Sequence, residues 1–280
     1  MTLREWLRKG EADLRTGPHP DRARRDAEML LLHHIGKDRA WLLTHLDEGF
    51  GGCGSIGYAA LLNRRLTGEP IQYITGSCEF YGLSFRLTPA VLIPRPETEL
   101  LVEKVRALAA DFAHPRILDV GTGSGSIAVS LSKYLTGAQI TGTDISSSAL
   151  DLAKENAKRH DVDIRFLHGN LLSPVASETF DLIVSNPPYV PEADRALLSV
   201  EVRDFEPGEA LFAGTDGLSV YRRLIPAAYA ALTAEGYLAL EIGFGQSEAV
   251  SAFLQSAGFS SIDFTPDLQG IPRVVVARRN

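Results

Sequence analysis

A strand that runs into a glycine-rich turn and then a helix most constrains what this chain can fold into. Residues 116–120 are mostly apolar and predict a buried strand, and three glycines alternating with Thr122 and Ser124 follow it directly. An apolar helix is expected from there through Tyr134. Beyond it, strand-like and helical segments keep alternating, which predicts an α/β, Rossmann-like domain whose parallel sheet has helices on both faces. A helix before this strand is expected to end near Phe112, a later strand to run from 236 to 242, and residues 262–264 and 274–276 to pair as an antiparallel edge of the sheet.

The spacing of these glycines indicates which ligand the turn suits. Dinucleotide sites use G-x-G-x-x-G, with a pyrophosphate over the helix N-terminus, whereas this chain has D-x-G-x-G-x-G starting at Asp119. A second predicted strand, 139–144, ends in Asp144, where an acid is placed to bind ribose hydroxyls. S-adenosylmethionine has a sulfonium, an ammonium and a ribose but no phosphate, so it suits both acids. The cofactor-binding residues expected here are Asp119, Gly121, Thr122, Gly123, Ser124, Gly125 and Asp144.

A third strand, 164–167, is expected to deliver the residues that flank the adenine ring. Asn170 and Leu171 lie in the loop just after it. The Asn170 side chain can donate or accept at the edge of the base, and Leu171 adds apolar contact. Both are therefore included among the cofactor-binding residues.

A second turn, stiffened by two prolines, follows a later strand. Residues 182–184 form a short apolar run that predicts a strand buried on both faces. Neither Pro187 nor Pro188 has an N–H to continue a strand, and Asn186, which precedes a proline, is restricted to extended backbone. We expect a rigid turn at the carboxyl end of this strand, next to the strand at 116–120.

The groups that this turn carries are suited to holding a planar NH2 group. The side-chain oxygen of Asn186 and the carbonyl of Pro187 can each accept one N–H, and the Tyr189 ring can cover the flat face. Such acceptors stabilise the positive charge that develops on nitrogen as it attacks a methyl group. Asn186, Pro187 and Tyr189 are thus the expected catalytic residues, and Asn186, Pro187, Pro188 and Tyr189 the expected substrate-binding residues.

Composition limits the classes of protein that remain. The 280 residues are 45% hydrophobic, enough for a full core, and carry a net charge of −7, which argues against a broad nucleic-acid-binding face. The two cysteines have neither disulfide-framework nor metal-site spacing. Residues 1–6 lack the apolar core of a signal peptide, and no apolar run approaches the ~18 residues needed to span a membrane. We expect a cytoplasmic protein with no bound metal and no membrane or direct nucleic-acid contact.

The first 75 residues predict a small helical bundle. Thr2 with Glu5 fits a capping box, Asp21 is expected to cap a second helix, and the basic groups at 22–25 and 64–65 are interpreted as solvated helix faces. The expected domains are a helical substrate-recognition domain at 1–75, a β-hairpin connector at 76–92 and a catalytic domain at 93–280. Arg95 and Glu97 either border the active site or only serve the start of a helix, and the sequence leaves both open.

Six motifs, taken together, resemble those of the HemK-type protein-(glutamine-N5) methyltransferases that modify class I peptide chain release factors. The proline-arginine-proline stretch at 93–99 and the Arg-Asp-Phe-Glu-Pro stretch at 203–207 are the specific ones, and the match covers nearly the whole chain. The remaining motifs lie at 68–71, 79–82, 119–125 and 186–189. The last two of these are shared with enzymes that methylate adenine in DNA.

This resemblance implies a seven-stranded methyltransferase domain, S-adenosylmethionine as cofactor and a release factor as protein partner. The substrate is then the glutamine of a Gly-Gly-Gln loop, with Asn186 in contact with both that amide and the cofactor. The chain departs from the pattern at 170–171, where relatives commonly have an acid followed by an aromatic residue. The adenine contact is therefore expected to differ.

Three other functions compete with this one. A DNA adenine-N6 methyltransferase shares the Asn-Pro-Pro-Tyr motif, but the negative charge and the lack of a base-reading domain argue against it. A non-catalytic binder of the methyl donor has no need of that motif. A dinucleotide oxidoreductase is disfavoured by the glycine spacing.

Overall fold

The computed structural model describes residues 1–280, and the chain divides into two compact units. A helical unit comprises Met1–Ser77 together with Leu198–Phe205, and a catalytic unit comprises Cys78–Leu197 and Glu206–Asn280. The short second segment of the helical unit therefore comes from the middle of the catalytic part of the sequence. No helix combines the length and apolar character that crossing a membrane requires.

The helical unit is a bundle packed around leucine and alanine side chains. Its helices are α1 (Leu3–Leu14), α2 (Ala23–Ile35), α3 (Arg39–His45), α4 (Cys53–Leu66), α5 (Ile71–Thr75) and α9 (Val200–Phe205). Its core includes Leu14, Leu30, Leu31, Leu42 and Leu62. The predicted capping box is present, with Glu5 N–H donating to Thr2 and Thr2 N–H donating to Glu5.

Two predictions for the bundle are wrong. Asp21 does not cap α2, because a 3-10 turn over Pro20–Arg22 precedes a helix that begins at Ala23 with no side-chain cap. Arg65 does not belong to a solvated face, because it is only 2% exposed. Its guanidinium lies 2.7 Å from Asp26 and 2.6 Å from Glu201, two acids distant in sequence.

A two-stranded sheet opens the catalytic unit, as predicted. Strands β1 (Ser77–Phe80) and β2 (Leu83–Arg86) are joined by Tyr81 and Gly82, both with positive φ. Positive φ at both central residues is typical of the tight turns that match strand twist. Phe80 and Phe85 anchor this hairpin in the core.

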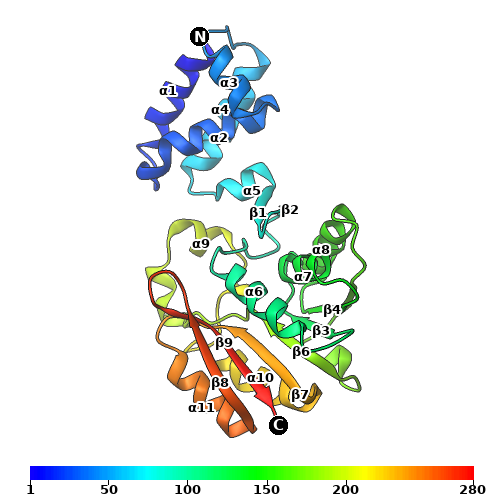
Figure 1. Cartoon of the computed structure of the whole chain (residues 1–280). Helices are drawn as coiled ribbons and strands as arrows, with labels where there is room; N and C mark the ends of the chain where they lie inside the picture. The colour runs from blue at the N-terminus through cyan, green and yellow to red at the C-terminus, as the bar shows by residue number, and fades with distance from the viewer. The chain divides into compact units, whose positions relative to one another are not determined.

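A seven-stranded sheet forms the centre of the catalytic unit, in the order β5-β4-β3-β6-β7-β9-β8 (Figure 1). Its strands are β3 (Arg116–Val120), β4 (Gln139–Asp144), β5 (Arg165–His168), β6 (Phe180–Ser185), β7 (Leu232–Glu241), β8 (Phe259–Pro266) and β9 (Pro272–Arg279). The first five are parallel, and β9 pairs antiparallel with both β7 and β8, which confirms the predicted antiparallel edge.

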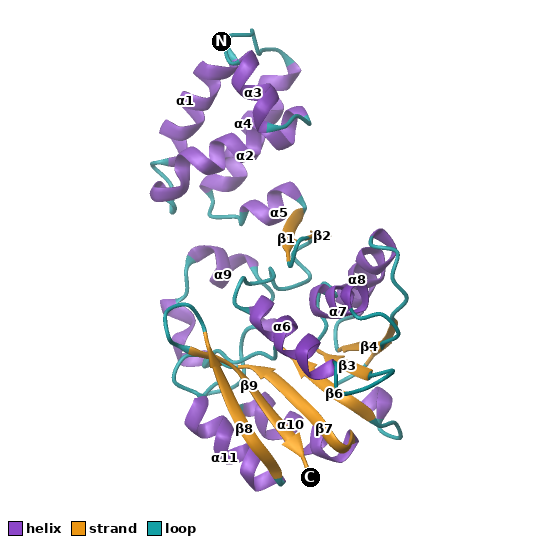
Figure 2. Cartoon of the chain, viewed as in Figure 1, coloured by secondary structure: helices purple, strands orange, loops and turns teal.

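Helices cover both faces of this sheet, as Figure 2 shows. They are α6 (Thr98–Ala109), α7 (Ser126–Tyr134), α8 (Ser147–Arg159), α10 (Ser219–Ala231) and α11 (Ser247–Ala257). Successive strand residues point to opposite faces, so in β6 Ile183 joins the core beneath α10 and α11 while Leu182 and Val184 join the core beneath α6 and α7.

Several boundaries differ from the predicted ones. Strand β7 begins at Leu232 rather than at residue 236, and α6 ends at Ala109 rather than near Phe112. The pairing of β7 with β6 shifts register near its start, where residues 233–235 are partly or fully exposed and give no apolar strand pattern. Pairing with a neighbouring strand, rather than local hydrophobicity, extends β7.

Candidate active site

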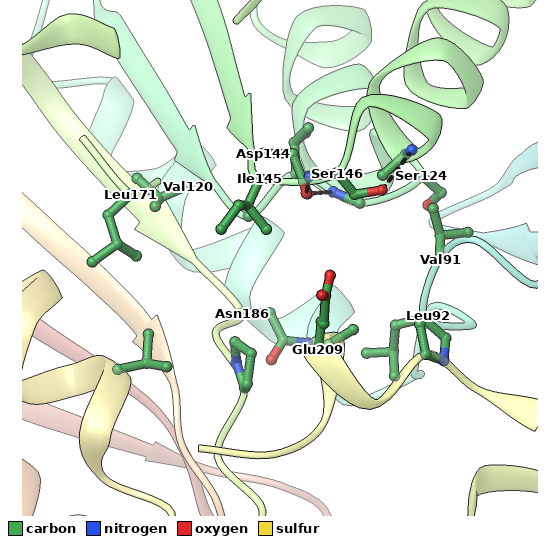
Figure 3. A pocket seen from close by; sticks show the side chains of 18 of the residues that line it. Val91, Leu92, Val120, Ser124, Asp144, Ile145, Ser146, Leu171, Asn186 and Glu209 are labelled. Carbon is green, nitrogen blue, oxygen red and sulfur yellow. Dashed lines mark hydrogen bonds between the residues drawn. The ribbon is translucent and has the colours of Figure 1, made fainter. Parts of the chain in front are cut away.

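A cavity of about 680 Å³ opens at the carboxyl ends of β3, β4 and β6 (Figure 3). From β3 the chain moves outward through β4 and β5, and then returns to β6 on the other side of β3. This reversal is the position at which open α/β sheets bind their ligands. The cavity therefore lies where the fold itself predicts a site.

The glycine-rich turn after β3 forms one wall of the cavity. Residues 121–124 line it, and Gly125 does not. Gly121 and Gly123 have φ of 74° and 56°, a conformation that side chains other than glycine rarely adopt. The turn is tied to β4, because Gly123 N–H donates to Asp144 Oδ2 over 2.8 Å.

The two predicted acids have different environments. Asp144 lines the cavity, and its other oxygen accepts from Ser146 N–H over 2.8 Å. Asp119 is fully buried beneath the turn, where Oδ2 accepts from the Thr122 hydroxyl at 2.6 Å and Oδ1 has no hydrogen-bond partner. Burial raises the pKa of Asp119 to about 7, and the nearby Asp144 charge adds to the rise.

The loops after β4 and β5 supply the apolar wall. Asn170 and Leu171 line the cavity as expected, and Leu171 adopts a positive φ of 52°. Ile145 also lines it and remains 57% exposed, a residue that sequence reasoning missed. Its position directly after the strand-end Asp144 was the available signal.

The Asn-Pro-Pro-Tyr turn follows β6 and forms the opposite wall (Figure 3). Asn186 and Pro188 line the cavity, whereas Pro187 and Tyr189 are absent from the lining. Asn186 Nδ2 donates to Thr98 Oγ1 over 3.1 Å, which leaves its Oδ1 as the amide's remaining acceptor. The backbone of Tyr189 is fixed by a hydrogen bond in which its carbonyl accepts from Gln246 Nε2 at 2.9 Å.

Arg95 and Glu97 do not line the cavity, although Pro94 and Thr98 do. The Arg95 guanidinium contacts both carboxylate oxygens of Glu206 at 2.7 Å. Glu97 is the residue that precedes α6. The structure therefore gives Arg95 a structural ion pair.

Two family models match the chain. The model described as "Methyltransferase small domain" matches residues 96–202, and the one described as "PrmC N-terminal domain" matches residues 5–76. Among solved structures, the T. thermophilus 16S rRNA N2 G1207 methyltransferase is similar in fold, with a TM-score of 0.56 and 18% identity over 73% of this chain and 50% of that one.

Two curated relatives are similar over almost their full length. The release factor glutamine methyltransferase of Geobacter sulfurreducens is 43% identical, over 92% of this chain and 90% of the relative. That of Koribacter versatilis is 40% identical, over 100% of this chain and 99% of the relative. The chain therefore belongs to the release factor glutamine methyltransferase family.

Proposed function

We propose that this chain methylates the side-chain amide nitrogen, N5, of the glutamine in the Gly-Gly-Gln loop of class I peptide chain release factors. The observation that carries this proposal is the position of Asn186 on the cavity wall, with Nδ2 already donating to Thr98. The remaining Oδ1 can accept an N–H from a substrate amide. Family membership supports the choice of glutamine and of a release factor.

S-adenosylmethionine is the methyl donor in this proposal, and the residues of the cavity suit it. Asp144 lines the cavity and can accept from ribose hydroxyls, whereas Asp119, whose Oδ1 has no hydrogen-bond partner, lies buried beneath the glycine turn and outside the lining, where its charge would favour a cationic ligand. Asn170, Leu171 and Ile145 provide a partly apolar place for adenine. When bound, the donor supplies an electrophilic methyl group: the N–C bond forms as the C–S bond breaks, sulfur keeps the electron pair, and nitrogen loses one proton.

The residues of the turn act on the substrate amide. An amide nitrogen is a poor nucleophile because its lone pair is delocalised, so it has to be oriented and its developing charge stabilised. In this proposal Asn186 Oδ1, on the cavity wall, accepts one N–H of that nitrogen. The Pro187 carbonyl and the Tyr189 ring, which do not line the cavity, are assigned to the second N–H and to the flat face of the amide. Acceptors that are already in place at the start of the reaction lose no energy to reorganisation.

The helical part of the chain, about residues 1–75, is assigned in this proposal to recognition of the release factor. The hairpin region, 76–92, connects it to the methyltransferase domain at 93–280. Support comes from the absence of a catalytic group in the bundle's interior, which is filled by apolar side chains and paired charges.

Incubation with labelled methyl donor tests the function. Four acceptors are offered in parallel: a release factor, the same factor with its loop glutamine replaced by asparagine, the same factor with alanine there, and duplex DNA. We expect label only on the unchanged factor, at the glutamine by mass spectrometry. Label on DNA, or equal label on the alanine variant, would refute the proposal.

A further inference from the structure

Glu241 is a buried carboxylate that comes to lie beside the Asn-Pro-Pro-Tyr turn. It ends β7 in an otherwise apolar run and is 2% exposed. Val184 pairs with Ala239 and Ser185 with Leu240, so the next positions, Asn186 and Glu241, are at the same level of neighbouring strands. Val184 and Ala239 point toward α6, and the alternation of side chains puts Asn186 and Glu241 on that face too.

Thr98, the first residue of α6, lies between these two side chains. Its hydroxyl donates to Glu241 Oε2 over 2.6 Å and accepts from Asn186 Nδ2 over 3.1 Å. The Tyr189 hydroxyl donates to the second oxygen, Oε1, over 3.4 Å. Asn186, through Thr98, and Tyr189, directly, are therefore both linked by hydrogen bonds to the carboxylate of Glu241.

The protonation state of Glu241 sets the direction of this hydrogen-bond chain. An ionised carboxylate can only accept, and a hydroxyl has one proton to donate. Thr98 must then donate to Glu241 and accept from the amide of Asn186. The NH2 group of Asn186 is thereby held toward Thr98, and its oxygen is left for the cavity.

A protonated Glu241 permits the reverse direction. Its O–H can donate to Thr98, whose own proton can then be donated to Asn186 Oδ1. That rotates the Asn186 NH2 group toward the cavity, where it would face the N–H groups of a substrate amide. Two donors facing each other form no hydrogen bond, so this orientation is unproductive.

We propose that Glu241, acting through Thr98, is a positioning residue that orients the carboxamide of Asn186 with its oxygen toward the substrate nitrogen. This inference rests on the proposed function and adds a requirement to it: the ionised form of a residue outside the cavity is needed for turnover. Neither Glu241 nor Thr98 touches the reacting atoms in this proposal.

The surroundings of Glu241 raise its pKa, so its carboxyl group ionises near neutral pH. The pKa of Glu241 is raised to about 7, chiefly by burial. The hydrogen bonds from Thr98 and Tyr189 and the charge of Arg273 on β9 oppose this rise, and the charge of Glu97 before α6 adds to it. Tyr221 of α10 donates to the backbone carbonyl of Glu241. The productive orientation is then populated increasingly as the pH rises through about 7.

Two substitutions at Thr98 separate positioning from packing. Thr98→Val keeps the shape and removes the hydroxyl, whereas Thr98→Ser keeps the hydroxyl and removes a methyl group. If Thr98 only fills space, valine should be the better substitute. If the Thr98 hydroxyl transmits the orientation, serine should retain at least about tenfold more kcat than valine, because valine removes both hydrogen bonds of that hydroxyl, the one to Glu241 and the one from Asn186.

The measurement is steady-state methylation of a release factor at saturating S-adenosylmethionine and varied release factor concentration, from pH 5.5 to 9. Wild-type kcat should rise with an inflection near 7, and Glu241→Gln should lose that inflection and about tenfold in kcat with KM little changed. Glutamine can both donate and accept, so it selects neither orientation. Calorimetric binding of S-adenosylhomocysteine to each variant reports whether the cofactor site is folded.

The outcomes distinguish this inference from the proposed function. A wild-type enzyme that does not methylate the release factor refutes the proposed function itself. An active wild type whose inflection survives in Glu241→Gln, or a Thr98→Val variant as fast as Thr98→Ser, overturns the positioning role alone.

Discussion

The helical unit and the strands β3 and β7 of the catalytic unit bury charge in opposite ways. In the helical unit, Arg65 lies between Asp26 and Glu201, and each buried charge has a partner of opposite sign. In the catalytic unit, Asp119 and Glu241 are as deeply buried but form no ion pair with a basic side chain. Their partners are hydroxyl groups instead.

This difference separates charges that hold the fold from charges available to a ligand or a reaction. A paired buried charge is neutralised within the protein. Removal of one partner leaves the other as an uncompensated buried charge, whose desolvation lowers the stability of the fold. A buried carboxylate without a cation keeps a raised pKa and lowers stability at neutral pH. Such groups are concentrated at functional sites.

The largest effect is expected for Arg65→Met. This change leaves the buried Asp26 without its cation and removes one of the basic partners of Glu201, and it should lower the free energy of unfolding by about 3–5 kcal/mol. Urea denaturation measures it. Arg64→Met is the matched control: the Arg64 side chain is 45% exposed, so solvent weakens its pair with Glu69 and a loss of about 1 kcal/mol or less is expected. Equal losses in the two variants would contradict the assignment of Arg65 as the structural charge.

For Asp119, which has no basic partner, we expect ionisation to lower the stability of the folded protein. Its pKa is about 7 in the folded protein against 3.8 ordinarily, so its contribution to stability is complete below about pH 4 and is lost as the pH rises through about 7. The loss corresponds to about 4 kcal/mol. Asp119→Asn should therefore flatten the pH dependence of unfolding between pH 4 and 8. A curve that keeps the wild-type slope would show that Asp119 does not titrate there.

Asn186→Ala tests the proposed hydrogen bond between Asn186 and the substrate amide. The variant should fold normally but methylate its substrate about 10²–10³-fold more slowly, because one preorganised acceptor is lost from the transition state. Single-turnover kinetics at saturating cofactor measure this rate. A rate within about threefold of wild type, under ~0.7 kcal/mol of barrier, would remove Asn186 from the mechanism.

The smallest effect is expected for Asp144→Ala. Loss of charge-assisted hydrogen bonds to the ribose should weaken S-adenosylmethionine binding by about tenfold or more. Isothermal titration calorimetry measures the dissociation constant, and Asp144→Asn, which keeps one acceptor oxygen, should fall between wild type and alanine. An unchanged constant in the alanine variant would exclude Asp144 from the cofactor site.

Much of the sheet could be predicted because its strands are short, apolar and ended by distinctive residues. Strand β4 ends at Asp144 as expected, and the glycine turn after β3 and the proline turn after β6 follow their strands directly. The backbone conformation of these turns is set by glycine and proline residues within the turn, so residue type and spacing are sufficient to predict the turns. The start of β7 was missed because pairing with β6 extends it.

The sequence by itself determined the two turns, their order along the chain and the kind of group each can bind, since backbone restriction by glycine and proline acts within a few residues. Only the tertiary structure decided which side chains stand behind those turns. Thr98 and Asn186 are 88 residues apart, Thr98 and Glu241 are 143 apart, and Arg65 finds Asp26 39 residues away. Polarity alone cannot identify such partners, because a buried polar group needs a hydrogen bond but does not specify where in the chain its partner lies.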